Sequence, residues 1–181
     1  MINIVLFGPP GAGKGTQSKY LIEKYNLVYI STGDMLRKEL KSESELGKKV
    51  QKVVNSGGLV SDEIIVQLIE KVIRENENSS GFLFDGFPRT YVQAYILDGL
   101  LHKLHVDITC MLMLDVSEEI LMERLLNRGE NRADDTKEVI QNRLKEYKSK
   151  TLPVIDYYKE KGIFYKVDGI GEIEDIHEKV V

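Results

Sequence analysis

The stretch FGPPGAGKGT, residues 7–16, continues directly from the apolar run INIVLF of residues 2–7. Four glycines and two prolines surround a single lysine in it. A glycine-rich turn between a buried strand and a helix lets backbone N–H groups converge on a phosphate, because glycine adopts positive φ and has no side chain in the way. A helix from about Thr16 would add the positive end of its dipole. We interpret residues 7–16 as a phosphate-binding loop.

The match to the phosphate-loop pattern G-x-x-x-x-G-K-[ST] runs from Gly8 through Lys14, and Gly15 then intervenes before Thr16. In this motif the lysine supplies a mobile charge for the β- and γ-phosphates, and the hydroxyl lies near a bound Mg²⁺. The alternative is a glycine-rich turn with a solvated lysine. The strand expected before the motif and the helix expected after it favour the phosphate loop.

Five runs rich in β-branched and aromatic residues predict strands at 2–8, 27–32, 81–87, 107–116 and 163–169. The first, third and fourth are almost continuously apolar, as expected for strands covered by helices on both faces. Helical patterns lie between them, which indicates βαβ units and a parallel sheet. We therefore predict an α/β fold of the P-loop NTPase type, with a five-stranded parallel sheet between two helical layers.

Two segments interrupt this alternation within one domain of residues 1–181. Residues 31–60 predict a helical insertion after the second strand, and the polar residues 127–135 predict a loop over a site. The core is then expected to comprise residues 1–30, 61–126 and 136–181. Helix N-caps are predicted at Ser61 or Asp62 and at Ser117, and Asp135 with Glu138 has the spacing of a capping box.

Composition excludes several classes of protein. Hydrophobic residues make up 42% and charged residues 30%, which are ordinary globular values. No apolar run is long enough to span a bilayer, and the features of a signal peptide are missing, so we expect a cytoplasmic protein without a membrane partner. A net charge of −4 argues against nucleic acid as a partner, and the single cysteine, Cys110, excludes an internal disulfide.

Six blocks of the sequence resemble, in the same order, the signature blocks of adenylate kinases of the short-lid type, within the nucleoside monophosphate kinases. They are GPPGAGKGTQ (8–17), STGDMLR (31–37), GGLVSDE (57–63), DGFPRTYVQA (85–94), RLLNRGENRADD (124–135) and RLKEY (143–147). The most specific of them contains DGFPRT. The resemblance implies the reaction ATP + AMP ⇌ 2 ADP with Mg²⁺, for adenine nucleotide homeostasis, with residues 31–60 as the NMP-binding insertion and 127–135 as a short lid.

The same resemblance implies roles for individual residues. ATP is expected at Gly11, Ala12, Gly13, Lys14, Gly15, Thr16, Arg128 and the backbone near Gly171. AMP is expected at Thr32, Arg37, Gly58, Leu59, Val60, Gly86, Phe87, Pro88, Arg89, Gln93, Arg132 and Arg143. The expected catalytic cations are Lys14, Arg89, Arg124, Arg132 and Arg143. Mg²⁺ is expected at Thr16 and, through water, at Asp85. ATP, AMP and ADP would be the partners of a monomeric enzyme.

Phosphoryl transfer suits this set of residues, because it needs aligned substrates and stabilised charge more than covalent help from the protein. Arg89 follows a buried strand, which places it at the carboxyl end of the sheet, where open α/β folds bind ligands. Arg124 and Arg128 are four residues apart and would share one helix face. For Arg124 and Arg143, a surface ion pair is the competing interpretation.

Two alternative functions remain. A UMP/CMP kinase shares the phosphate loop and GFPR, but pyrimidine relatives tend to have alanine where this chain has Thr32. A nucleotide-binding switch would not need the second set of phosphate contacts. His102 and His105 have no third ligand nearby in sequence for a structural zinc, and the lid, with only GEN between Arg128 and Arg132, is shorter than in other short-lid relatives.

Overall fold

The computed structural model describes residues 1–42, 44–55, 60–127 and 137–181. Its strands form one parallel sheet in the order β2-β3-β1-β4-β5, which confirms the predicted fold class. The strands are β1 (Ile2–Phe7), β2 (Val28–Ser31), β3 (Gly81–Asp85), β4 (Cys110–Asp115) and β5 (Phe164–Asp168).

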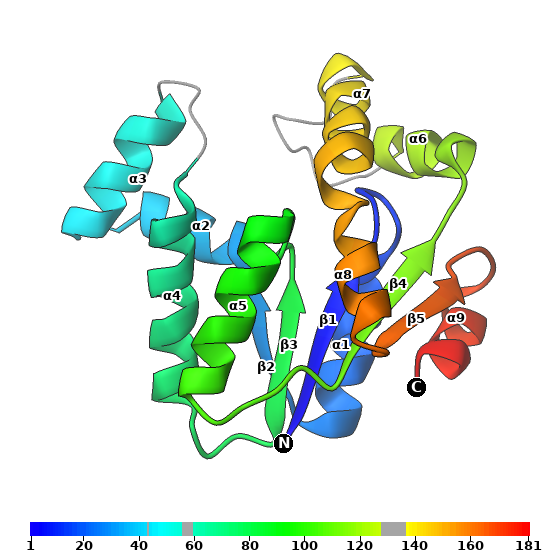
Figure 1. Ribbon diagram of the computed structural model, residues 1–181. Coiled ribbons are helices and arrows are strands. Elements are labelled where there is room, and N and C mark those ends of the chain that lie inside the picture. Colours follow the sequence, from blue (N-terminus) through cyan, green and yellow to red (C-terminus); the bar gives the residue numbers. More distant parts are fainter. Residues whose placement is uncertain (43, 56–59, 128–136) are drawn as a thin grey trace.

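Helices follow or connect these strands. They are α1 (Lys14–Tyr25), α2 (Thr32–Leu40), α3 (Glu45–Asn55), α4 (Asp62–Glu75), α5 (Tyr91–Lys103), α6 (Glu118–Leu126), α7 (Lys137–Glu146), the π-helical turn η1 (Tyr147–Thr151), α8 (Val154–Glu160) and α9 (Ile173–Val180). The strand arrows point toward the end of the molecule at which α2, α3, α6 and α7 lie (Figure 1).

The apolar strands are buried on both faces of the sheet. Along β1, Val5 and Phe7 belong to one hydrophobic cluster with residues of α4, α5 and α8. Ile4 and Leu6 point the other way and cluster with residues of α1, α6, α7 and α9. This arrangement explains the continuous apolar run in place of an alternating one.

Three strands end level with one another, and this alignment positions the site. Ser31 of β2 pairs with Asp85 of β3, and Asp85 pairs in turn with Leu6 of β1. Each strand leaves the sheet at or just beyond this row. The phosphate loop, the turn that begins at Gly86 and helix α2 therefore all start at the same edge of the sheet.

All five strands are shorter than predicted, and for β4 and β3 the structure shows the reason. β4 begins at Cys110 instead of residue 107, because Asn3 engages the preceding residues: Asn3 Nδ2 donates to the Asp107 carbonyl at 2.8 Å, and the Asn3 N–H donates to Thr109 Oγ1 at 3.0 Å. β3 ends at Asp85 instead of residue 87, because Gly86 turns the chain with φ 80°.

Helix starts agree with the sequence in most places. α1 begins at Lys14, two residues before the predicted start, because Gly13 caps it in a left-handed conformation. Ser61 and Ser117 are the N-caps of α4 and α6, as predicted. The predicted capping box falls partly outside the described residues, since Asp135 is not among them.

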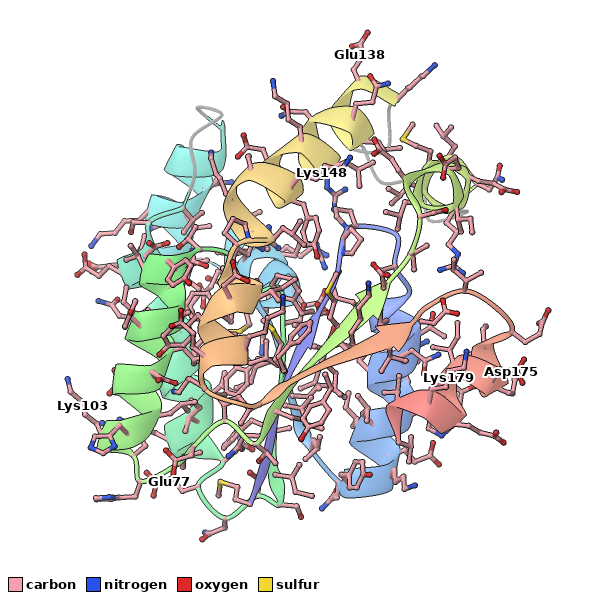
Figure 2. All side chains as sticks on the ribbon, turned by 45° about the vertical axis from the view of Figure 1, so that its right-hand side comes forward. Glu77, Lys103, Glu138, Lys148, Asp175 and Lys179 are labelled. Carbon is pink, nitrogen blue, oxygen red and sulfur yellow. The ribbon has the colours of Figure 1, made fainter. Side chains whose placement is uncertain are left out.

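Charged side chains cover the outer surfaces of the helices. In Figure 2, Glu77 and Lys103 lie at the opposite end of the molecule from Glu138, and Asp175 and Lys179 lie on α9 at one side of the sheet. Within the part of the chain that the structure describes, none of the helices is both long and apolar enough to cross a membrane.

Candidate active site

The phosphate loop between β1 and α1 depends on two glycines for different reasons. Gly11 has φ 85°, and a Cβ there would lie 2.9 Å from Leu125 Cγ of α6. Gly13 has φ 94°, and no heavy atom of the described residues lies within 4 Å of the place where its Cβ would be. The loop is therefore packed tightly against α6 at one glycine and is open at the other.

Helix α1 directs its positive end into this loop. Its first turn, KGTQ, brings a lysine but not a carboxylate, and its N-cap is a glycine. The Lys14 ammonium curls back over the loop and donates to the carbonyls of Gly8 at 2.8 Å and Pro9 at 3.1 Å. Backbone N–H groups, the helix dipole and a full positive charge thus converge on one small volume, which suits a phosphate.

A second group of polar residues surrounds the turn after β3. Thr32 Oγ1 donates to the Gly86 carbonyl at 3.0 Å, and Arg89 Nε donates to the same carbonyl at 2.7 Å. The Arg89 N–H donates to Gln93 Oε1 at 2.7 Å. The Gly86 carbonyl therefore joins Thr32, at the start of α2, to the Arg89 guanidinium.

Gln93 extends this network to the next helix. Its Nε2 donates to Asp62 Oδ1 at 2.6 Å, which ties the start of α5 to the start of α4. An amide oxygen has two lone pairs and an amide nitrogen has two protons, so both ends of Gln93 can take a second partner from a ligand.

Arg89 is exposed to solvent, yet nearby protein atoms partly desolvate its guanidinium. This partial desolvation lowers the pKa of Arg89; Asp85 opposes the shift and Arg143 of α7 adds to it. Arginine keeps its charge throughout the physiological range. The structure thus brings Asp85 and Arg89, from the end of β3 and the turn after it, within electrostatic range of Arg143 on α7.

Asp85 also accepts a hydrogen bond from β2, the Tyr29 hydroxyl lying 2.7 Å from Asp85 Oδ2. Burial raises the pKa of Tyr29, and the charge of Asp85 raises it further, so the phenol stays a donor at neutral pH. Asp85 pairs with Leu6, which directly precedes the phosphate loop of residues 7–16. Thr16 and Asp85 both offer the oxygen ligands that Mg²⁺ prefers, so the residues fit the ion that the sequence predicts there.

Two predicted arginines make contacts that the sequence does not indicate. Arg124 of α6 donates from Nη2 to the Gly169 carbonyl at 3.1 Å, which places it against the loop between β5 and α9. Gly171, predicted to contact ATP, lies in this same loop with φ 127°. Arg37 forms an ion pair with Asp34 of its own helix, and 53% of its side-chain surface is exposed.

The remaining predicted residues differ in burial, and some of them lie outside the described part of the chain. Phe87 and Pro88 are buried, and Val60 is half-buried. Gly58, Leu59, Arg128 and Arg132, with all of the predicted lid except Asn127, lie outside the described residues. Ala12 and Thr32 are buried, whereas Gly15 is exposed.

Two residues near the site were missed from the sequence. Tyr29 lies in β2 two residues before the strand ends, and its only sequence signal is a polar hydroxyl between the apolar residues Val28 and Ile30. Gln17 is buried on α1 together with Ser18 and Leu21. The signal available in the sequence was Leu21, an apolar residue four positions after Gln17 and therefore on the same helix face.

The described side chains do not support two other kinds of site, a metal-binding cluster and a cysteine nucleophile. Among residues 1–42, 44–55, 60–127 and 137–181, no three His, Cys, Asp or Glu side chains are grouped so that they could hold a metal ion. Cys110 is half-buried at the start of β4, and burial raises its pKa to about 11, so it is a thiol and not a thiolate nucleophile at neutral pH.

This arrangement places an anion cradle on β1 beside a cationic group on β3 and α7. Preorganised cations and N–H donors act most strongly on charge that develops during a reaction, such as the charge on the oxygens of a phosphoryl group in transfer. The geometry therefore suits two phosphate-bearing ligands that meet at the carboxyl edge of the sheet.

Comparison with known proteins agrees with this geometry. A family model described as adenylate kinase matches residues 6–163. An adenylate kinase of Flavobacterium psychrophilum is 48% identical over 183 residues, covering 99% of this chain and 96% of the relative. Adenylate kinases of Flavobacterium johnsoniae (49% identical; 99% and 96% covered) and Prochlorococcus marinus (45% identical; 99% and 97% covered) are similar at full length too.

Proposed function

The chain belongs to the adenylate kinase family and is a phosphotransferase, and we propose that it transfers a phosphoryl group reversibly between ATP and AMP, with Mg²⁺, to form two ADP. The observation that carries the proposal is the row of Ser31, Asp85 and Leu6, after which three segments leave the sheet at one edge. The contacts to the phosphoryl donor therefore start within two strand spacings of the contacts to the phosphoryl acceptor, and in-line transfer requires this closeness.

In the proposed mechanism, the loop from Gly11 to Thr16 holds the donor phosphates through its backbone and the α1 dipole. Lys14, whose ammonium already lies over the loop, would turn from the Gly8 and Pro9 carbonyls to the phosphate oxygens. Thr16 and Asp85 would hold Mg²⁺, which when bound neutralises charge on the phosphates.

The acceptor phosphate would meet Arg89, whose guanidinium plane is set by its bond to the Gly86 carbonyl. Arg143, from α7, adds a second positive charge close enough to lower the pKa of Arg89. Together they would stabilise the equatorial oxygens of the transferred group. Once both substrates are bound, bulk water would be kept out of the site, so the phosphoryl group would not be lost to hydrolysis.

The proposal includes a division of the chain into parts. The core comprises residues 1–30, 61–126 and 136–181, with residues 31–60 as the AMP-binding insertion and 127–135 as the lid. Arg37 and the backbone of residues 58–60 would join the acceptor site from the insertion. From the lid, Arg128 would contact ATP and Arg132 would contact AMP. We further propose a cytoplasmic monomer that interconverts adenine nucleotides.

A compound that joins two adenosines through five phosphates is expected to bind at least a hundredfold more tightly than ATP. One molecule would fill both half-sites, so the second site is occupied without a further loss of translational freedom. Calorimetry with this compound, ATP and AMP measures the difference, alongside a coupled assay of ADP formation. An affinity no better than that of ATP would leave a one-nucleotide switch as the better interpretation.

Thr32→Ala is expected to reduce the selectivity for AMP over UMP by about 3- to 10-fold, the loss of roughly one hydrogen bond. The Thr32 proton is directed at the Gly86 carbonyl, so the hydroxyl oxygen can only accept from a ligand. The adenine amino group can donate to it, whereas the corresponding oxygen of uracil cannot.

The ratio of kcat/KM for AMP to that for UMP measures this selectivity, and Thr32→Ser, which keeps the hydroxyl, serves as the control. If the ratio is the same in Thr32→Ala and the wild type, the argument against a pyrimidine kinase is lost.

Gly15→Ala is expected to raise the free energy of unfolding by about 0.5–1 kcal/mol, because alanine loses less conformational freedom in a helix than glycine does. ATP affinity is expected to fall at least about tenfold, since the new Cβ would enter open space beside the proposed phosphate site. Urea denaturation and calorimetry test the two parts.

Gly99→Ala is the matched control, because Gly99 also lies in a helix, α5, with no described heavy atom within 4 Å of the position that a Cβ would take there. It should give a similar gain in stability and leave ATP affinity unchanged. Equal ATP affinities in both variants would show that the ATP phosphates do not bind beside Gly15.

A further inference from the structure

Two hydrogen bonds and one ring contact lie along the packed helices α1 and α9, from one end to the other. Gln17 Nε2 donates to the Ile173 carbonyl at 3.1 Å, the Tyr20 and His177 rings lie 4.2 Å apart between centroids, and the Tyr25 hydroxyl donates to the Val181 carbonyl at 3.1 Å. The Gln17 contact is the one at the end nearest the phosphate loop. It links the first turn of α1 to the first residue of α9.

The loop that precedes α9 is held at its other end by separate bonds. The Gly169 N–H donates to the Asp115 carbonyl of β4 at 2.9 Å, and the Gly169 carbonyl accepts from Arg124 at 3.1 Å. The Ile170 N–H donates to Asp168 Oδ1 at 3.0 Å. Residues 169–173 are thus fixed at the start by β4 and α6, and at the end by Gln17.

Between these anchors the loop presents surface suited to a planar base. No heavy atom of the described residues lies within 4 Å of where a Cβ on Gly171 would be, so its backbone is accessible. Ile170 and Ile173 are 43% and 46% exposed, which provides apolar surface on either side of that backbone. A purine ring needs both apolar contact and backbone hydrogen-bonding groups.

The environment of Gln17 indicates more than simple packing. Only 2% of its surface is exposed, and its Oε1 has no hydrogen-bond partner among the described residues. A buried acceptor without a partner is destabilising, and an apolar side chain of the same length would avoid that penalty. The amide contributes one specific interaction in return, the bond from Nε2 to Ile173.

We infer that Gln17 is a positioning residue for the donor nucleotide: it connects the helix that binds the phosphates to the 169–173 loop, which receives the base. The inference rests on the proposed function for the identity of the donor as ATP. Gln17 does not itself contact the phosphates in this scheme. It sets the distance between the phosphate cradle and the base surface.

The test compares Gln17→Met with Tyr25→Phe. Methionine keeps the length of the side chain and removes the donor, and Tyr25→Phe removes the same kind of bond from the same pair of helices at the far end. In Gln17→Met, the KM and dissociation constant for ATP should rise about tenfold, equivalent to about 1.4 kcal/mol. The KM for AMP should change less than about twofold in both variants. In Tyr25→Phe, the KM for ATP should also change less than about twofold.

Inorganic tripolyphosphate distinguishes the base from the phosphates. Its affinity should be the same in the wild type and in Gln17→Met, because it does not reach the 169–173 loop. The thermal midpoint of Gln17→Met should stay within a few degrees of the wild type, since the lost bond and the removed unpaired acceptor offset each other. Unchanged ATP binding in Gln17→Met, or an equal loss for tripolyphosphate, would overturn the inference.

A measurement on the wild type decides the question if Gln17→Met does not fold. The side-chain amide resonance of Gln17 should shift when ATP is added and should stay in place with tripolyphosphate. Equal responses to the two ligands would overturn the inference. A wild-type protein that forms no ADP from ATP and AMP would instead refute the proposed function, and the two titrations would still report on Gln17.

Discussion

Lys14→Ala is expected to lower kcat/KM for ATP and AMP by about a thousandfold, the upper range for removing one preorganised charge contact to a transition state. The ammonium lies over the phosphate loop, 2.8 Å from the Gly8 carbonyl, so it needs only a short movement to reach a bound phosphate. A coupled assay of ADP formation with saturating Mg²⁺ measures the loss. Most of it should fall on kcat, because the charge on the transferred group increases as the reaction proceeds.

Lys19→Ala serves as the control, since Lys19 is exposed on the same helix and comes five residues after Lys14. It removes the same charge from the protein and should keep kcat/KM within about twofold of the wild type, as is usual for a surface charge. Similar losses in the two variants would mean that the overall field, and not the position of Lys14, carries the effect.

Arg89→Lys is expected to lower kcat/KM by about a hundredfold even though it preserves the charge. Arg89 uses Nε to bond the Gly86 carbonyl while the rest of its guanidinium remains available for a phosphate. Lysine cannot make both interactions at once, because its single ammonium lacks the planar set of donors. Steady-state kinetics with AMP varied at saturating ATP measures the change.

Arg74→Lys is the matched control, because Arg74 of α4 bonds Glu70 through Nε and Nη2 at an exposed position. It should leave kcat/KM unchanged. Activity of Arg89→Lys equal to that of the wild type would show that only the charge matters at this position, and would remove the role proposed for the Gly86 carbonyl.

Much of the fold could be predicted because its causes are local. Buried parallel strands require apolar side chains on both faces, and the runs at β1, β3 and β4 show them without interruption. The strand ends were less predictable. Asn3, buried in the middle of the sheet, takes the Asp107 carbonyl and Thr109 into its own hydrogen bonds and so delays the start of β4.

The candidate site was also predictable only in part: its charged residues could be found in the sequence, but their partners could not. Lys14 and Arg89 were predicted because each stands in a short motif next to a strand end, and the structure places both at the carboxyl edge. Arg124 was predicted to act on a polyphosphate, and its observed partner is the Gly169 carbonyl. The arginine was visible in the sequence, whereas its partner was not.

The sequence by itself determined the order of strands and helices, the glycine-rich loop and the supply of cations, because backbone preferences and burial depend on residue type. Only the tertiary structure decided that Ser31, Asp85 and Leu6 lie in one row, and that Gln17 bonds Ile173 across 156 residues of chain. The physical reason is that strand register is set by packing, and that the acceptors at Gly86, Gly169 and Ile173 are backbone carbonyls. Every residue has such a carbonyl, so its use as an acceptor leaves no mark in the sequence.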